Sequence, residues 1–172
     1  MIRVAVLFTD GTEEIEALTP VDVLKRAGAE VDIVSLENLY PIGSHKITVK
    51  ADKLIGEVKA SDYDAIVVPG GLVGSKNISE NEKAISLIKE FESGGKLVCS
   101  ICASPAVVIA KHGICAGKKS TCYPAPDFIS LIKNYTGKDV EVDGNLITAD
   151  GIKSAFSFSL AICKALGITP RF

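Results

Sequence analysis

Short apolar runs alternate along this chain with segments whose apolar residues recur at helical spacing. The runs are nearly continuous in apolar side chains, which is typical of strands buried on both faces of a parallel sheet. They cover residues 2–8, 30–35, 64–68 and 96–100. Strands that alternate with helices imply a mostly parallel sheet with helices on both faces, and right-handed crossovers then give a flavodoxin-like three-layer α/β/α sandwich.

Two segments interrupt this alternation. Within the segment 39–55, residues 46–50 alternate polar and apolar side chains, which predicts a small β-hairpin appended to the main sheet. Asp143 and Gly144 form a strong hairpin turn signal between two short apolar runs. The chain has 172 residues and no repeat, low-complexity tract or linker, so residues 1–172 are expected to form a single domain.

The balance of charges argues against nucleic-acid and membrane partners. Lysine and arginine number 19 against 21 acidic residues, aromatic residues make up 6% of the chain, and tryptophan is absent. Neither a basic surface nor a platform for stacking bases is therefore expected. No apolar run approaches the roughly 18 residues that a membrane span needs. Five cysteines and an N-terminus without a signal-peptide pattern favour reduced thiols in a cytoplasmic protein.

Cys102 lies between a predicted buried strand and a helix whose first residue is Pro105. Proline favours the first helical position, so Ser104 is expected to cap the helix and Cys102 to occupy a tight strand-to-helix turn. This placement resembles a nucleophile elbow, and the positive end of the helix would favour the thiolate and lower the thiol pKa. The alternative is a buried structural cysteine, which is common.

Acidic residues and a glycine pair follow two other predicted strands, at the same edge of the sheet as that cysteine. Glu16 adjoins apolar residues and is expected to point inward, where a nearby thiolate would favour its protonated form. It could then donate a hydrogen bond to sulfur and act as an acid or base. The dipole of the helix explains Glu13 and Glu14. Gly70 and Gly71 could offer backbone N–H groups to an oxyanion, although glycine pairs are also common in plain turns.

Neither histidine completes an evident Cys-His-acid triad. His112 lies at the far end of the helix that begins at Pro105, out of reach of Cys102, whereas His45 lies in the predicted hairpin and could reach the mouth of the site. Cys99 and Cys102 have C-x-x-C spacing, but Cys99 falls inside a strand and is expected to be buried and inert. No residues have clear metal-site spacing, and an acidic loop would repel the phosphate of a flavin, so no metal or cofactor is expected.

Three segments, in this order and spacing, resemble the ThiJ/PfpI superfamily: GTEEIEALTPVDVLKRAG, YDAIVVPGG and VCSICASPAVVIA. They look most similar to its branch of the Parkinson's-disease-associated protein deglycase and its bacterial relatives, and the resemblance covers residues 2–166. It implies a homodimer with a reactive cysteine at Cys102 and an acid partner at Glu16. It also implies oxyanion donors in the backbone of Gly70, Gly71 and Ala103.

Two positions depart from the pattern of this superfamily. Ala103 stands where its peptidases have a histidine directly after the cysteine, which argues against proteolysis. Tyr123 stands where deglycase and glyoxalase members have a histidine before proline. The third catalytic group is therefore open: Tyr123 could orient the substrate, or His45 could substitute, including from a partner subunit.

The residues and the resemblance together predict a cofactor-independent glyoxalase III or protein deglycase-like enzyme, acting on reactive aldehydes such as methylglyoxal or on glycated proteins. The Cys102 thiolate would attack the aldehyde, and Glu16 would move a proton between two carbons. The alternative is an oxidative-stress sensor or redox-regulated chaperone, in which Cys102 oxidises to a sulfinate without turnover. A thiol–disulfide oxidoreductase that uses Cys99 and Cys102 is a third reading.

Overall fold

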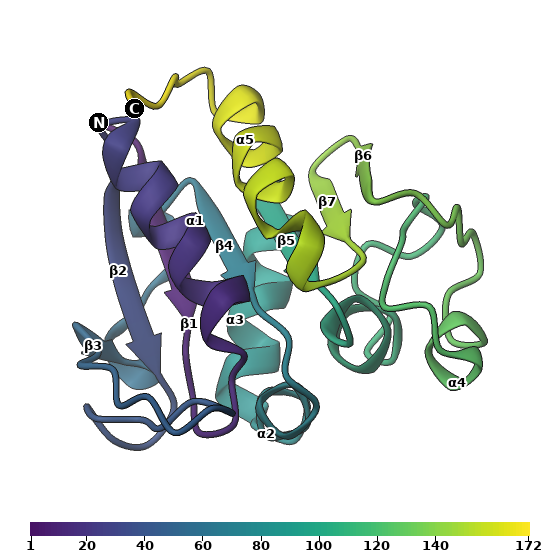
Figure 1. The fold of residues 1–172 in the computed structure, drawn as a ribbon, viewed down its shortest axis with the longest axis horizontal. Helices are drawn as coiled ribbons and strands as arrows, with labels where there is room; N and C mark the ends of the chain where they lie inside the picture. The colour runs from purple at the N-terminus through teal and green to yellow at the C-terminus, as the bar shows by residue number, and fades with distance from the viewer.

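A seven-stranded sheet forms the centre of the molecule, with strand order β3-β2-β1-β4-β5-β7-β6 (Figure 1). The computed structural model describes all 172 residues. Neighbouring strands are parallel except β6 and β7, which form an antiparallel hairpin. The strands are β1 (Arg3–Leu7), β2 (Glu30–Ser35), β3 (Lys53–Leu54), β4 (Ala65–Val68), β5 (Leu97–Ile101), β6 (Val140–Asp143) and β7 (Leu146–Ala149).

Helices cover both faces of this sheet and confirm the predicted flavodoxin-like sandwich (Figure 1). They are α1 (Glu14–Arg26), α2 (Leu72–Ser79), α3 (Glu82–Ser93), the π-helix η3 (Pro105–Ala110), α4 (Pro126–Ile129) and α5 (Ala155–Ala165), with short 3-10 turns η1 (Ile55–Glu57), η2 (Ala60–Asp62) and η4 (Ile152–Ser154). Buried side chains of α1 and α5 pack on one face, and those of α3 and η3 pack on the other. None of these helices combines the length and apolar character required to span a bilayer.

The central strands contribute side chains to both apolar cores. On β1, Val4 and Val6 join the cluster of α1 and α5, while Ala5 and Leu7 join the cluster of α3, and all four are fully buried. Burying a valine or leucine side chain stabilises a fold by about 1.5–3 kcal/mol. Because both faces of the sheet are covered, apolar side chains suit nearly every position, which explains the continuous apolar runs in the sequence.

The hairpin predicted within residues 39–55 is present in a reduced form, as a strap of residues 39–52 that precedes β3. It closes on itself through an antiparallel bridge between Ile42 and Thr48 and a hydrogen bond from the Gly43 N–H to the Ile47 carbonyl (2.9 Å). Only β3 joins the sheet, and it pairs parallel to β2. Residues 46–48 of this hairpin are all exposed, and Val49 is the residue of the predicted alternation that packs partly against the core.

Two local signals can be compared directly with the structure. The turn predicted at Asp143 and Gly144 connects β6 to β7, and Gly144 takes the left-handed conformation that such a turn needs (φ 59°). Pro20 lies inside α1, which already begins at Glu14, so this proline does not mark the start of the helix. Its missing N–H removes one helical hydrogen bond, and its ring is buried with the apolar face of α1.

The carboxyl ends of β1, β4 and β5 lie side by side because these are adjacent central strands. The loops that follow them therefore meet at one edge of the sheet. The Glu13 N–H donates to the Gly70 carbonyl (3.0 Å), and the Gly74 N–H donates to the Gly11 carbonyl (3.2 Å), which ties the first two loops together. Ligands of open α/β sheets bind at this edge.

Candidate active site

Cys102 follows β5 directly and has a left-handed backbone, with φ of 65°. A residue other than glycine in this conformation costs roughly 1–3 kcal/mol, and such strain concentrates at functional sites. The Cys102 N–H donates to the Ala149 carbonyl (2.9 Å), and the Cys102 carbonyl accepts from the Tyr123 N–H (2.8 Å). The expected strand-to-helix elbow is therefore present, and its cysteine is half-buried rather than sealed in the core.

Ser104 does not cap the following helix, contrary to the prediction. Its backbone is already helical (φ −65°, ψ −34°), and its side chain makes no capping hydrogen bond. The hydroxyl instead donates to the carbonyl of Pro69 (2.6 Å), in the loop after β4. The helix that begins at Pro105 is a π-helix, in which the Lys111 N–H bonds to the Ala106 carbonyl five residues earlier (3.0 Å). The Ser104 hydroxyl, which the local sequence pattern predicts to cap the helix, thus binds a carbonyl that is distant in sequence.

Glu16 lies in the first turn of α1 and is fully buried. Its Oε2 accepts a hydrogen bond from the Gly70 N–H (2.9 Å), and its Oε1 is buried without a hydrogen-bond partner. A methyl group added at Gly70 would overlap Oε2 of Glu16 and lie 2.6 Å from Cβ of Cys102. Glycine is thus required here, and the side chains of Glu16 and Cys102 meet around it.

The protonation of this pair is set by burial. Burial raises the pKa of Glu16 to about 7, and the charge of Glu13 adds to the rise, while interactions with the Cys102 thiol and the Gly70 N–H oppose it. Burial also raises the pKa of Cys102 to about 12, and the Glu16 carboxylate adds to that rise. The expectation of a lowered thiol pKa is therefore wrong, because lost hydration and a neighbouring carboxylate outweigh the helix end. Between these values the pair holds one proton and one negative charge.

Backbone N–H groups of Gly71 and Ala103 favour the ionised form of the Cys102 sulfur through hydrogen bonding. Gly71 has a left-handed backbone (φ 86°), and a side chain there would collide with the loop after β1. The N–H of Gly70, the third predicted oxyanion donor, is already taken by Glu16. Two of the three predicted backbone donors are therefore available at the sulfur.

Tyr123 lies beside the elbow, but its side chain makes no hydrogen bond with Cys102 or Glu16. Its backbone N–H binds the Cys102 carbonyl, as described above. The side chain is 51% exposed and packs edge-on against Phe128, with ring centres 6.4 Å apart. An exposed aromatic ring thus stands next to the cysteine turn, at the position where the resemblance leads one to expect a histidine.

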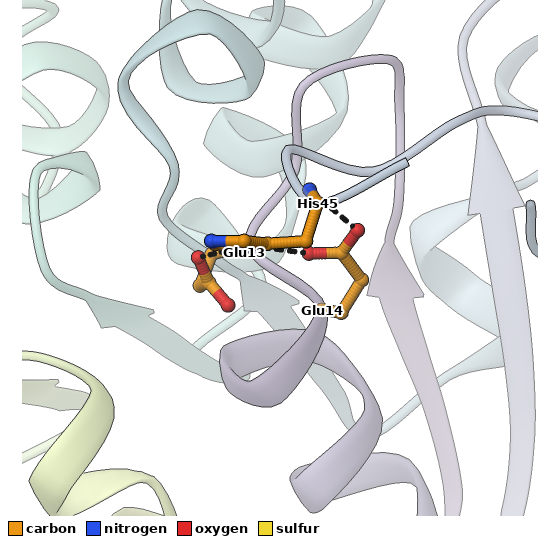
Figure 2. A group of neighbouring side chains, drawn as sticks. All are labelled: Glu13, Glu14 and His45. Carbon is orange, nitrogen blue, oxygen red and sulfur yellow. Dashed lines mark hydrogen bonds and ion pairs between the residues drawn. The ribbon is translucent and has the colours of Figure 1, made fainter. Parts of the chain in front are cut away.

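Glu13, Glu14 and His45 are the one group of three neighbouring side chains that could hold a metal ion (Figure 2). Nδ1 of His45 lies 3.3 Å from a carboxylate oxygen of each glutamate. Oε1 of Glu14 also accepts the N–H groups of His45 (2.8 Å) and Ile47 (3.4 Å), and the Ser44 hydroxyl lies 3.1–3.2 Å from both carboxylates. Groups of the strap therefore contact the carboxylate oxygens of both glutamates, and the single Ser44 hydroxyl proton can be donated to one of them.

No sequence pattern indicates the structural role of Glu13 and Glu14. The helix dipole accounts for acidic residues at these positions, but both side chains are also buried and hold the strap against the start of α1. His45 belongs to the same contacts and makes no hydrogen bond with the thiol of Cys102. Glu14 and His45 lie 31 residues apart along the chain, so no local sequence pattern could predict their contact.

The other four cysteines are free thiols buried in the molecule. Burial raises the pKa of each of them: Cys99, Cys115, Cys122 and Cys163. Cys99 lies within β5, as predicted, and forms no disulfide with Cys102. The second histidine, His112, has its Nε2 2.9 Å from the hydroxyl oxygen of Ser79 and takes no part in the elbow.

Known proteins share both the sequence pattern and the fold of this chain. The model of the DJ-1/PfpI family matches residues 2–165. The chain belongs to the DJ-1/PfpI family. Protein DJ-1 homolog B of Arabidopsis thaliana is 40% identical over 163 residues, or 94% of this chain, although this chain spans only 37% of that longer protein. A Pyrococcus abyssi protein named as a deglycase is 35% identical over 150 residues, covering 86% of this chain and 89% of its own length.

A solved structure of the DJ-1/PfpI family supports the same assignment. Toxoplasma gondii DJ-1, solved in an oxidised form, matches with a TM-score of 0.91 and 36% sequence identity. The match covers 96% of this chain and 91% of the Toxoplasma chain. The elbow, the glycine loop and the first turn of α1 therefore belong to an architecture shared across nearly the whole domain.

Proposed function

We propose that this DJ-1/PfpI family member is a cysteine-dependent glyoxalase III or protein deglycase-like enzyme, acting on reactive aldehydes such as methylglyoxal or on glycated proteins. The observation that carries the proposal is the meeting of Cys102 and Glu16 at one edge of the sheet, with backbone N–H groups at the sulfur. The deglycase name of the Pyrococcus relative supports the same class of chemistry. The proposed reaction uses no cofactor.

Glu16 acts first as a general base. Its pKa of about 7 suits proton transfer near neutral pH. As the Cys102 sulfur attacks the aldehyde carbon, Glu16 takes the thiol proton and passes it to the aldehyde oxygen, which gives a hemithioacetal. The N–H groups of Gly71 and Ala103 stabilise the negative charge that develops during this step.

Glu16 next moves a proton between the two carbons of the bound substrate. Its carboxylate removes the proton from the hemithioacetal carbon, and the adjacent carbon takes it back through an enediol. The former aldehyde carbon is thereby oxidised and the former ketone carbon reduced, which leaves a thioester of lactate on Cys102. Water then cleaves the carbon–sulfur bond, so methylglyoxal and water give lactic acid with no external oxidant or reductant.

The remaining predicted residues have supporting places in this scheme. Tyr123 is proposed to orient the substrate from the rim, because its backbone binds the Cys102 carbonyl and its ring is exposed. His45 is engaged with two glutamates of its own chain, so the proposed scheme gives it no catalytic step. We also propose a homodimer in the cytoplasm. Light scattering tests the dimer through a mass of about 36 kDa, twice the 18.1 kDa of one chain.

Lactate formation from methylglyoxal tests the proposed enzyme. The wild type is expected to form lactate, and Cys102→Ser and Glu16→Gln are expected to lose at least about a hundredfold in rate. Ser159→Ala, which removes a buried hydroxyl from α5, is the matched control and keeps the wild-type rate. Equal rates for the wild type and Cys102→Ser would remove Cys102 from the mechanism.

A second candidate function is an oxidative-stress sensor or redox-regulated chaperone. Oε1 of Glu16 is buried near the thiol without a hydrogen-bond partner, so a protonated Glu16 could donate from this oxygen to a sulfinate on Cys102. The similar Toxoplasma protein was solved in an oxidised form. Mass spectrometry after mild peroxide, run beside the lactate assay, separates the two functions. Sulfinate on Cys102 alone, with no lactate formed, favours the sensor.

A further inference from the structure

The peptide between Pro69 and Gly70 is held from both sides, by elements that carry the reactive pair. Its carbonyl, which belongs to Pro69, accepts the hydroxyl of Ser104 (2.6 Å). Its N–H, which belongs to Gly70, donates to Oε2 of Glu16 (2.9 Å). Because a peptide is planar and rigid, this single unit links the turn after Cys102 to the Glu16 carboxyl group.

The number of hydroxyl protons determines the direction of the hydrogen bonds that lead from Ser75 through Ser104 to the Pro69 carbonyl. Ser104 has one hydroxyl proton and donates it to the Pro69 carbonyl, so its oxygen is left to accept from the hydroxyl of Ser75 (2.7 Å). The backbone N–H of Ser75 makes the first helical hydrogen bond of α2, to the Gly71 carbonyl (2.8 Å), so α2 fixes the position from which this hydroxyl donates. Ser75 therefore supports Ser104, and Ser104 supports the Pro69–Gly70 peptide.

Packing alone does not explain these two hydroxyl groups. Both serines are fully buried, and a buried hydroxyl is unfavourable unless it is hydrogen-bonded. Ser104 makes no capping hydrogen bond for η3, and Ser75 lies inside α2, where alanine would be the better helix former. What the hydroxyls add is orientation of the loop that contacts Glu16.

We propose that Ser104 and Ser75 are positioning residues, which fix the Pro69–Gly70 peptide and thereby aim the carboxyl group of Glu16 at Cys102. They act through this peptide and not on the substrate. The inference rests on the proposed roles of Glu16 and Cys102, but it concerns how the pair is held and can be measured without turnover.

This role predicts a change in the pH at which Cys102 reacts. The Gly70 N–H favours the ionised form of Glu16 and so limits the rise of its pKa. In Ser104→Ala the peptide is free to turn, the hydrogen bond to Glu16 weakens, and the carboxylate forms at higher pH. The midpoint for alkylation of Cys102 by iodoacetamide is expected to move upward by about 0.5–1 pH unit.

The experiment measures this midpoint in the wild type, Ser75→Ala, Ser104→Ala, the double variant and Ser159→Ala. Ser159 is the matched control, because it is equally buried and donates to the Ala155 carbonyl (2.7 Å), but it lies on α5, on the other face of the sheet. Ser104→Ala is expected to show the full shift, Ser75→Ala a smaller shift in the same direction, and Ser159→Ala none. Because Ser75 acts through Ser104, the double variant is expected to match Ser104→Ala.

An unchanged midpoint in both single serine variants, or an equal shift in Ser159→Ala, would overturn the inference. If circular dichroism shows that Ser104→Ala does not fold, the midpoint of Ser75→Ala decides by itself. The readout also separates this inference from the proposed activity. A shifted midpoint in a protein that forms no lactate would reject the enzyme and keep the positioning role.

Discussion

Cys102 and Glu16 share a proton, so neither group titrates alone. The pair loses its first proton near pH 7, the pKa of Glu16. A small fraction of the singly charged pairs carries the charge on sulfur, and this fraction does not change with pH, because both singly charged forms hold the same number of protons. Although burial raises the pKa of the thiol itself, alkylation of Cys102 is expected to speed up with pH and to level off above a midpoint of about 7. Rates with iodoacetamide between about pH 5 and 9, followed by mass spectrometry, measure this midpoint.

Glu16→Gln is the matched variant for this measurement. The amide keeps the shape of the side chain and accepts the Gly70 N–H, but it takes no proton from the thiol. Alkylation then depends on ionisation of Cys102 alone, whose pKa burial keeps high, so the midpoint is expected to move to more alkaline pH by about two units or more. If the alkylation midpoint of Glu16→Gln stays near pH 7, a group other than Glu16 accepts the Cys102 thiol proton.

The same carboxyl group is expected to weaken the fold as the pH rises. The pKa of Glu16 rises from 4.5 to about 7 on folding, so the folded state holds the proton more tightly between these values. Its contribution to stability is complete below pH 4.5 and is lost as the pH passes through about 7. Relative to Glu16→Gln, the wild type should lose about 2–3 kcal/mol of unfolding free energy between pH 5 and 8, measured with urea. A constant difference between the two proteins would contradict the raised pKa.

Among the structural elements, the strap and the start of α1 are joined mainly through Glu14. Burial by itself would raise the pKa of Glu14, but its own N–H group and those of His45 and Ile47 hold it below its ordinary value. Glu14→Ala leaves these N–H groups without an acceptor and is expected to lower the unfolding free energy by about 2–3 kcal/mol. Urea unfolding measures the loss, and faster proteolysis within residues 39–52 should accompany it.

His45→Ala is the contrasting variant for the strap. The imidazole is 68% exposed, and exposed ion pairs contribute less than about 1 kcal/mol, so only a small loss of stability is expected. Equal losses of unfolding free energy in His45→Ala and Glu14→Ala would show that the ion pair, and not the backbone hydrogen bonds, holds the strap.

The elements differ in how far sequence could predict them, for physical reasons. A strand covered on both faces is apolar throughout, so β1, β4 and β5 are visible as runs of apolar residues. The strap forms the antiparallel bridge that its alternation predicts, but the buried carboxylates of α1 that hold it lie too far away in sequence to be predicted. Ser104 has the residue type and position of a helix cap, yet the carbonyl of Pro69 from another loop competes for its hydroxyl.

For the molecule as a whole, strand order brings the site together and packing sets its chemistry. The meeting of Glu16, Gly70 and Cys102 could be predicted, because parallel strands end at one edge of a sheet. The direction of the thiol pKa shift could not. It depends on how much water the surrounding helices exclude and on the placement of one carboxylate, which are properties of the assembled domain.

Alkylation of a buried cysteine measures how often the assembled domain opens. Cys99 is fully buried in β5, between two parallel neighbours, and burial raises its pKa. Alkylation of Cys99 therefore requires the sheet to open, and a domain stable by about 5 kcal/mol or more has fewer than roughly one molecule in a thousand open. Cys102 is thus expected to react in buffer without unfolding, whereas Cys99 is expected to react only where the domain opens, and both should react at a similar rate in urea above the unfolding midpoint. Peptide-resolved mass spectrometry measures both rates, and fast labelling of Cys99 in buffer would show that β5 opens locally, without unfolding of the domain.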